Sequence, residues 1–297
     1  MDQLDAIKGW TYCSVRIMRI GEMRMQTRIG FIGTGNMGAS ILRGILRSGT
    51  VGHENIYIFD TDKNKMEALA KETGVTACSG NAELARICDY IILAVKPAAV
   101  PQALAEAKDS FTDEKVLVSI AAGISIDSLR RHAGGDIKIV RTMPNLPLMV
   151  GEGMTVISFG DRISEEEKRT VKELFRSSGE AEELDEKLMN EVIALTSSSP
   201  AYVFMMIEAM ADGAVQQGIP RQAAYKLAAQ AVLGSAKMVL ETGLHPAELK
   251  DRVCSPAGTT IEAVNELEKC GFRHAIMSAM KACTDRAAEI GRSTESR

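Results

Sequence analysis

The hydrophobic and polar positions of this chain follow different patterns in its two halves. Up to about residue 185, short apolar runs alternate with amphipathic stretches, which is the pattern of parallel strands connected by helices. From Glu186 onward the apolar runs give way to long Ala- and Met-rich helical stretches that are interrupted at Gly- and Pro-containing turns. The pattern therefore predicts an α/β domain followed by an all-helical domain.

The apolar runs of the first half predict strands, and the amphipathic stretches between them predict helices. We expect strands at residues 28–32, 55–59, 75–77, 89–95, 116–120, 137–143 and 154–158, and helices at 39–48, 63–73, 82–87 and 164–177. In the second half, breaks between helices are expected at 218–220, 243–246, 255–258 and 270–271. Residues 1–27 are expected to be an N-terminal extension, poorly ordered or translated from an upstream start, so the predicted domains are 28–185 and 186–297.

Three glycines follow the first predicted strand at the G-x-G-x-x-G spacing. Gly33 permits a tight turn, Gly35 lets backbone amides approach a pyrophosphate, and Gly38 lets the next helix pack closely on the strand. Because the motif stands between a strand and a helix, it predicts a Rossmann dinucleotide-binding domain with the phosphates at the helix N-terminus.

A carboxylate, Asp60, stands at the end of the second predicted strand, about 20 residues beyond the glycine loop. A Rossmann fold places there the group that binds the ribose 2′-hydroxyl of NAD and repels the 2′-phosphate of NADP. The alternative is a strand-end Asp that caps the following helix. The small residues after the strand at 116–120 leave room for a flat ring.

Composition narrows the function classes. The net charge of −4 and the absence of basic runs interleaved with aromatics argue against a nucleic-acid surface. No apolar run in residues 1–27 is long enough to span a membrane. The six cysteines show no metal-ligand spacing, so we expect no metal and reduced core thiols in a cytoplasmic protein.

A dinucleotide site implies hydride transfer, yet the side chains that usually protonate a reduced carbonyl are missing from recognisable motifs. His245 precedes a proline in a predicted turn, where a structural role is favoured. Reduction of a C=N bond fits this absence, because an iminium already carries its proton and needs mainly orientation and capture. Two predicted loops, 196–200 and 255–260, carry hydroxyls before predicted helices and suit capture of a carboxylate, plain helix capping being the alternative.

Small residues recur along 209–236 and let helices approach closely. So much of the second half is apolar that part of its surface should face another chain.

Together these residues resemble pyrroline-5-carboxylate reductase, the enzyme family that closes proline synthesis. The resemblance covers about residues 28–292 and is most specific between His245 and Glu262. It implies an NAD(P)H-dependent reductase that delivers hydride to the imine carbon of 1-pyrroline-5-carboxylate and yields L-proline. It also implies a helical domain that dimerises, often by intertwining, with the active site near the dimer interface and higher assemblies built from dimers. Its further motifs are the glycine loop, Ala94–Pro97, Ser119–Gly123, Met143–Asn145 and Ser199–Tyr202.

The resemblance also implies roles for individual residues. The substrate is expected to bind Ser255, Gly258, Thr259 and Thr260, with the Thr260 hydroxyl at the ring nitrogen as the catalytic candidate. The cofactor is expected to contact Ile32, Gly33, Thr34, Gly35, Asn36, Met37, Asp60, Asn81, Ala94, Val95, Lys96, Pro97, Ala121, Ala122, Gly123 and Glu186.

Three departures from the family pattern involve four positions. Ala257 replaces a usual glycine, and Gly258 is expected to take the positive φ that the loop needs. Ser197 and Ser199 replace glycines before Pro200, which alters packing expected under the nicotinamide. Asp60 replaces groups compatible with a 2′-phosphate and therefore predicts that NADH is accepted and preferred.

Other readings of the same residues remain. A β-hydroxyacid dehydrogenase would carry a G-x-x-x-K-x-x-x-N helix in its second domain, which the sequence lacks. A non-catalytic dinucleotide sensor would have no use for the loop from Ser255 to Thr260. A reductase of a related cyclic imine would keep the same loop and is separated only by a substrate assay.

Overall fold

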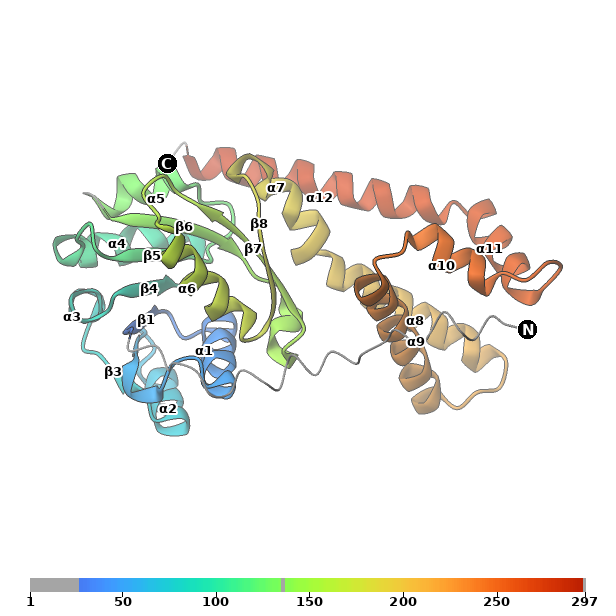
Figure 1. Cartoon of the computed structure of the whole chain (residues 1–297), viewed down its shortest axis with the longest axis horizontal. Helices are drawn as coiled ribbons and strands as arrows, with labels where there is room; N and C mark the ends of the chain where they lie inside the picture. Colours follow the sequence, from blue (N-terminus) through green and yellow to red (C-terminus); the bar gives the residue numbers. More distant parts are fainter. Residues whose placement is uncertain (1–26, 135–136, 296–297) are drawn as a thin grey trace. The chain divides into compact units, whose positions relative to one another are not determined.

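The structure of the chain, a computed structural model, describes residues 27–134 and 137–295 (Figure 1). The predicted extension at 1–27 lies outside the described residues, apart from Thr27. The chain divides into two units: residues up to Thr142 with Leu148–Glu183, and Met143–Pro147 with Leu184–Arg297. The segment Met143–Pro147 thus belongs to the helical unit, although the two predicted domains were each continuous in sequence.

The first unit is built on an eight-stranded sheet of order β3-β2-β1-β4-β5-β6-β7-β8. β1 lies between β2 and β4 and is parallel to both, so the strand order reverses at β1. This is the doubly wound arrangement that the glycine motif predicted. The strands are β1 Ile29–Ile32, β2 Ile56–Phe59, β3 Thr76–Ala77, β4 Tyr90–Leu93, β5 Val116–Ser119, β6 Lys138–Met143, β7 Gly153–Phe159 and β8 Gly179–Glu183.

Helices cover both faces of the sheet, and alternate strand residues feed two separate cores. Phe31 and Ile92 pack into the core on the side of α1, α2 and α6, whereas Ile91 and Leu93 pack into the core on the side of α3, α4 and α5. Burial on both faces is why these strands read as continuous apolar runs. The helices are α1 Asn36–Ser48, α2 Lys63–Thr73, α3 Asn81–Ile87, α4 Val100–Ala107, α5 Ile126–Ala133 and α6 Glu165–Arg176.

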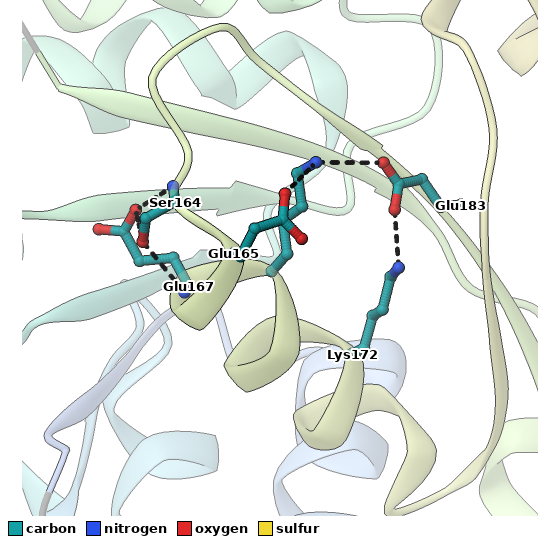
Figure 2. Close-up of polar contacts among 6 residues, drawn as sticks. Ser164, Glu165, Glu167, Lys172 and Glu183 are labelled. Atoms are coloured by element: carbon teal, nitrogen blue, oxygen red, sulfur yellow. Dashed lines mark hydrogen bonds and ion pairs between the residues drawn. The ribbon is translucent and has the colours of Figure 1, made fainter.

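Polar contacts tie α6 to the neighbouring strand β8 (Figure 2). Ser164 and Glu167 form the predicted capping box, each side chain bonding the other's backbone amide. Lys172 of α6 binds the carboxylate of Glu183 on β8 at 2.6 Å. The sequence prediction missed β8, because only Gly179 and Ala181 of its five residues are buried and the other three are exposed glutamates.

The second unit is helical, and all four predicted breaks between helices are confirmed. α8 and α9 pack against each other along their length (Figure 1). The helices are α7 Met189–Val192, α8 Ser199–Gln216, α9 Arg221–Thr242, α10 Pro246–Val253, α11 Thr259–Lys269 and α12 Phe272–Glu295, with a π-helix at Ile193–Ser197 joining α7 to α8.

The π-helix corrects one prediction, since residues 196–200 are not a loop. Pro200 has no N–H to give to the carbonyl of Thr196 four residues earlier, and Asn145 Nδ2 donates to that carbonyl instead at 3.0 Å. The Ser199 hydroxyl donates to the Leu195 carbonyl at 2.6 Å, and the Thr196 hydroxyl to the Val192 carbonyl at 3.1 Å. These hydroxyls satisfy backbone acceptors of the helix.

Candidate functional site

The glycine loop has the geometry that a pyrophosphate requires. Gly33 has φ +98°, and a Cβ there would lie 2.7 Å from the Ala94 carbonyl oxygen. A Cβ at Gly38 would lie 2.6 Å from the Gly33 carbonyl oxygen, so α1 packs on the loop at backbone distance. Gly35, by contrast, is exposed and has open space where a Cβ would stand. Backbone amides at the start of α1 therefore face an opening that fits phosphate groups.

The turns after β4 and β5 join the glycine loop at the carboxyl edge of the sheet, beside the point where the strand order reverses. Ala94 N donates to the Ile32 carbonyl at 2.8 Å, which places the Ala94–Pro97 turn directly beside the loop. After β5, Ala121 N donates to the buried Ser119 hydroxyl at 3.2 Å, and Gly123 turns the chain with φ +76°. Ligands of doubly wound sheets bind at such an edge.

Asp60, at the end of β2, is bonded to the glycine loop itself. Its Oδ2 accepts from Thr34 N at 2.6 Å and from Thr34 Oγ1 at 3.0 Å, and its Oδ1 accepts from Asp62 N at 2.9 Å. Partial burial opposes ionisation, but the amides of Thr34 and Asp62 outweigh it and lower the pKa of Asp60. The carboxylate is thus charged at neutral pH, and Oδ1 keeps a lone pair for one more donor.

Two further predicted cofactor residues, Asn81 and Glu186, lie outside the glycine loop and the turns after β4 and β5. Asn81 is the first residue of α3, is 5% exposed, and follows the strand beside β2. Glu186 belongs to the helical unit, where it begins a short 3-10 helix, Glu186–Leu188. The other predicted cofactor residues belong to the end of β1, the start of α1 and the loops of the first unit that have just been described.

The predicted substrate loop is a tight turn that leads into α11. Gly258 N donates to the Ser255 carbonyl at 3.0 Å, Pro256 holds the second position, and Ala257 holds the third with φ +56°. This is the pattern of a type II turn, which requires a positive φ at its third position. The expectation that Gly258 takes the positive φ is wrong, since its φ is −84°.

A side chain at Gly258 would have to displace the hydroxyl of Ser255. A Cβ at this position would lie 2.2 Å from the Ser255 hydroxyl oxygen. As the N-cap of α11, Gly258 offers no side chain to the amides of the first helical turn. Thr259 and Thr260 stand at that start, exposed and partly exposed, and no hydrogen bond of either hydroxyl to another described residue is present. The amides and hydroxyls suit capture of a carboxylate beside a ring nitrogen.

The remaining candidates have structural roles. His245 is the N-cap of α10 and accepts from Ala247 N through Nδ1 at 3.2 Å, which confirms the structural role expected for it. Cys78 and Cys88 are buried, and burial raises the pKa of Cys78 to about 11. Cys270 is exposed, so the prediction that all the thiols lie in the core is wrong for it.

Two contacts near the predicted site residues were not predicted from the sequence, although Asn145 itself belongs to the Met143–Asn145 motif. Glu106 of α4 binds the amide of Asn81, and Asn145 binds the carbonyl of Thr196. The first contact joins residues 25 positions apart and the second joins residues 51 positions apart. No local spacing signals such pairs. The Pro at 200 did signal that one helix carbonyl lacks its usual donor.

Comparisons with known proteins agree on one family. The sequence model described as "Pyrroline-5-carboxylate reductase dimerisation" matches residues 186–290, and that described as "NADP oxidoreductase coenzyme F420-dependent" matches residues 28–123. The chain is 48% identical over 269 residues to pyrroline-5-carboxylate reductase of Escherichia coli, covering 91% of this chain and 100% of that protein. It is 42% identical over 265 residues to that of Methanosarcina acetivorans, covering 89% and 98%.

Solved structures include close neighbours. The crystal structure of Plasmodium falciparum pyrroline carboxylate reductase with NADP bound has a TM-score of 0.81 and 33% identity, covering 91% of this chain and 100% of that one.

Proposed function

The chain belongs to the pyrroline-5-carboxylate reductase family, and from this premise we propose that the start of α11 holds the substrate while Asp60 makes NADH the preferred donor. The chain is an NAD(P)H-dependent oxidoreductase that reduces 1-pyrroline-5-carboxylate to proline, the last step of proline biosynthesis. The single observation that carries the substrate site is the uncapped start of α11 after the Ser255–Gly258 turn.

In this proposal the amides of Thr259 and Thr260 bind the substrate carboxylate, and the helix dipole favours its charge. The Thr260 hydroxyl contacts the ring nitrogen and orients the imine. The nicotinamide, when bound, supplies the hydride that the imine carbon accepts. The residues of the first unit fit such a cofactor. The glycine loop leaves free space at Gly35, whereas the backbone packs closely against Gly33 and Gly38. Because the iminium brings its own proton, no acidic side chain is required.

Replacing Thr260 by Ala tests the substrate site. A hydroxyl bonded to a charged group contributes about 1.5–3 kcal/mol, so kcat/KM for 1-pyrroline-5-carboxylate should fall about 10- to 150-fold while the dissociation constant of NADH stays unchanged. Ser235→Ala is the matched control, because that hydroxyl only bonds the Ala231 carbonyl within α9. Unchanged turnover of Thr260→Ala would remove Thr260 from the site. Amino-acid analysis of the product separates proline from the product of a related cyclic imine.

Asp60 is the basis for the preference for NADH. A 2′-phosphate carries about −1.5 to −2 charges, and each pair of unit charges 4 Å apart in water costs about 1 kcal/mol. The carboxylate should therefore disfavour NADPH by about 2 kcal/mol, or about 30-fold. Asp60→Ser should shift the ratio of kcat/KM values toward NADPH by that factor.

Thr34→Val is the control for Asp60, because it removes the hydroxyl bond to Oδ2 and leaves the charge and the Thr34 amide bond in place. Its cofactor ratio should match that of the wild type. Equal kcat/KM values for NADH and NADPH in the wild type would refute the preference. If Thr34→Val shifts the ratio of kcat/KM values as much as Asp60→Ser does, the shape of the loop, rather than the charge of Asp60, sets the cofactor preference.

The helical unit is proposed to pair with a second copy in a cytoplasmic homodimer, which can assemble further. Its family description is dimerisation, and large apolar side chains of α8 and α9 are exposed, among them Met205 at 68% and Leu240 at 82%. The helical stretch Glu186–Gln216 is also long and apolar enough to cross a membrane, with a mean hydropathy of 1.3. Light scattering of the detergent-free protein separates the two: a stable dimer supports the proposal, and a need for detergent contradicts it.

A further inference from the structure

One buried amide in the first unit is held by a carboxylate on the neighbouring helix. Asn81 Nδ2 donates to Glu106 Oε2 at 2.8 Å, and Gln102 Nε2 donates to the other oxygen, Oε1, at 3.0 Å. Both oxygens of Glu106 are therefore engaged, one by α3 and one within α4. Asn81 is 5% exposed, whereas Glu106 lies on the exposed side of α4.

This arrangement fixes which end of the Asn81 amide points where. An ionised carboxylate only accepts hydrogen bonds, so the amide nitrogen must face Glu106 and the carbonyl oxygen must face away from it. The carbonyl oxygen, Oδ1, is buried and receives no hydrogen bond from any residue in the described part of the chain. A buried acceptor without a donor is unfavourable, so a donor that arrives with a ligand would be bound strongly.

The position of Asn81 identifies the kind of donor. Cys78 N donates a hydrogen bond to the Ile58 carbonyl of β2. The pairing of β3 with β2 therefore continues into the segment that precedes α3. Asn81 thus starts its helix at the carboxyl edge of the sheet, the edge that also carries Asp60 at the end of β2. A dinucleotide bound at this edge brings phosphates, which only accept at neutral pH, and ribose hydroxyls, which donate. Oδ1 therefore suits a ribose hydroxyl.

We propose that Glu106 is a positioning residue for the cofactor: it holds the Asn81 amide so that Oδ1 accepts a hydrogen bond from a ribose hydroxyl of NAD(P)H. The inference rests on the proposed function in one respect, namely that this edge of the sheet binds the dinucleotide. Glu106 itself contacts no reacting group. Without Glu106 the Asn81 amide can rotate and place its nitrogen toward the ribose. Both groups would then be donors, and no hydrogen bond would form between them.

The test is a set of single and double variants of the full-length protein, with Michaelis constants for both substrates. Glu106→Ala should raise the KM for NADH about three- to tenfold, with kcat and the KM for 1-pyrroline-5-carboxylate nearly unchanged. Glu106→Gln should recover part of the loss, because its amide oxygen can still accept from Asn81. Gln102→Ala is the matched control, since it removes the other hydrogen bond of the same carboxylate and should leave the KM for NADH within twofold.

A double-variant cycle distinguishes positioning through Asn81 from a direct or merely structural effect. In an Asn81→Ala background, Glu106→Ala should have no further effect on the KM for NADH. An additive effect would overturn the proposal, as would an unchanged KM in Glu106→Ala. If Asn81→Ala raises the KM while Glu106→Ala does not, the cofactor edge stands and the positioning role fails. Failure of the proposed function would appear separately, as absence of proline formation by the wild type with either cofactor.

Discussion

Ala257 occupies a backbone conformation that favours glycine, which makes Ala257→Gly an informative change. Among the described residues it is the one non-glycine residue with positive φ, at +56°. It stands at the third position of the Ser255–Gly258 turn, where a type II turn requires such a φ. The strain therefore lies in the turn that precedes α11, whose first residues we propose bind the substrate.

The magnitude follows from two opposing terms. An L-residue in the left-handed region costs about 1–2 kcal/mol, which glycine avoids. Glycine loses about 0.4–1 kcal/mol more than alanine on folding, because its unfolded chain is more flexible. The difference favours Ala257→Gly by about 0.5–1 kcal/mol. A chain of this length should then melt about 1–4 °C higher.

The same strain should affect substrate binding. Flipping the peptide between Pro256 and Ala257 would convert a type II turn to type I and relieve the strain, so type I is the competing form that this prediction assumes for the wild type. Glycine at 257 favours the type II form. The KM for 1-pyrroline-5-carboxylate should fall by up to about fivefold, as expected when 1 kcal/mol of conformational bias is removed.

Thermal melting and Michaelis constants of the purified variants test this reasoning. Gly243→Ala is the matched control, because Gly243 has φ +63° and a Cβ there would meet nothing within 4 Å. It should lower the melting temperature by a similar amount. If Gly243→Ala is destabilising while Ala257→Gly leaves both stability and KM unchanged, Ala257 does not carry the strain and the argument fails.

Two further changes test other parts of the structure. Asn145→Ala should lower the free energy of unfolding in urea by about 1–3 kcal/mol. The loss should be smaller in a Pro200→Ala background, because residue 200 then regains an N–H for the Thr196 carbonyl. Equal losses in both backgrounds would contradict this reasoning. The hydrogen bond from Lys172 lowers the pKa of Glu183, so its stabilisation is present above about pH 4.3 and is lost as pH falls through that lowered pKa. Since Glu183 is 40% exposed, Glu183→Gln should cost less than about 1 kcal/mol at pH 7, and this cost should decrease as acid protonates the carboxylate, as melting curves over a range of pH would show.

Much of the fold followed from the apolar pattern, because β1, β4 and β5 are buried along their whole length and the helices of the first unit bury one face. α2 was predicted at 63–73 and runs from Lys63 to Thr73. The missed β8 has no such signal, since its three glutamates are exposed and the lysine that pairs with Glu183 lies on α6, outside the strand. A pattern of polarity cannot report a strand that is held by its neighbours rather than by its own apolar face.

The candidate site divides in the same way. The glycine loop could be predicted, because close backbone approach demands glycine at Gly33 and Gly38. Its bond to Asp60 could not, since the sequence gives the charge of the carboxylate but not which donor it meets. The positive φ was assigned to Gly258 instead of Ala257. A glycine permits a positive φ, but the geometry of the whole turn decides which residue adopts it.

The placement of Met143–Pro147 with the helical unit has a consequence for how this gene can recombine. A crossover near residue 184 looks like a clean exchange of one domain for another, yet it would leave Asn145 with the old partner and Thr196 with the new one. Where the first parent lacks an amide at 145 and the second parent carries a proline at 200, the hybrid would inherit a helix carbonyl without this donor. The two halves of this protein are therefore expected to be inherited together, as a single evolutionary unit.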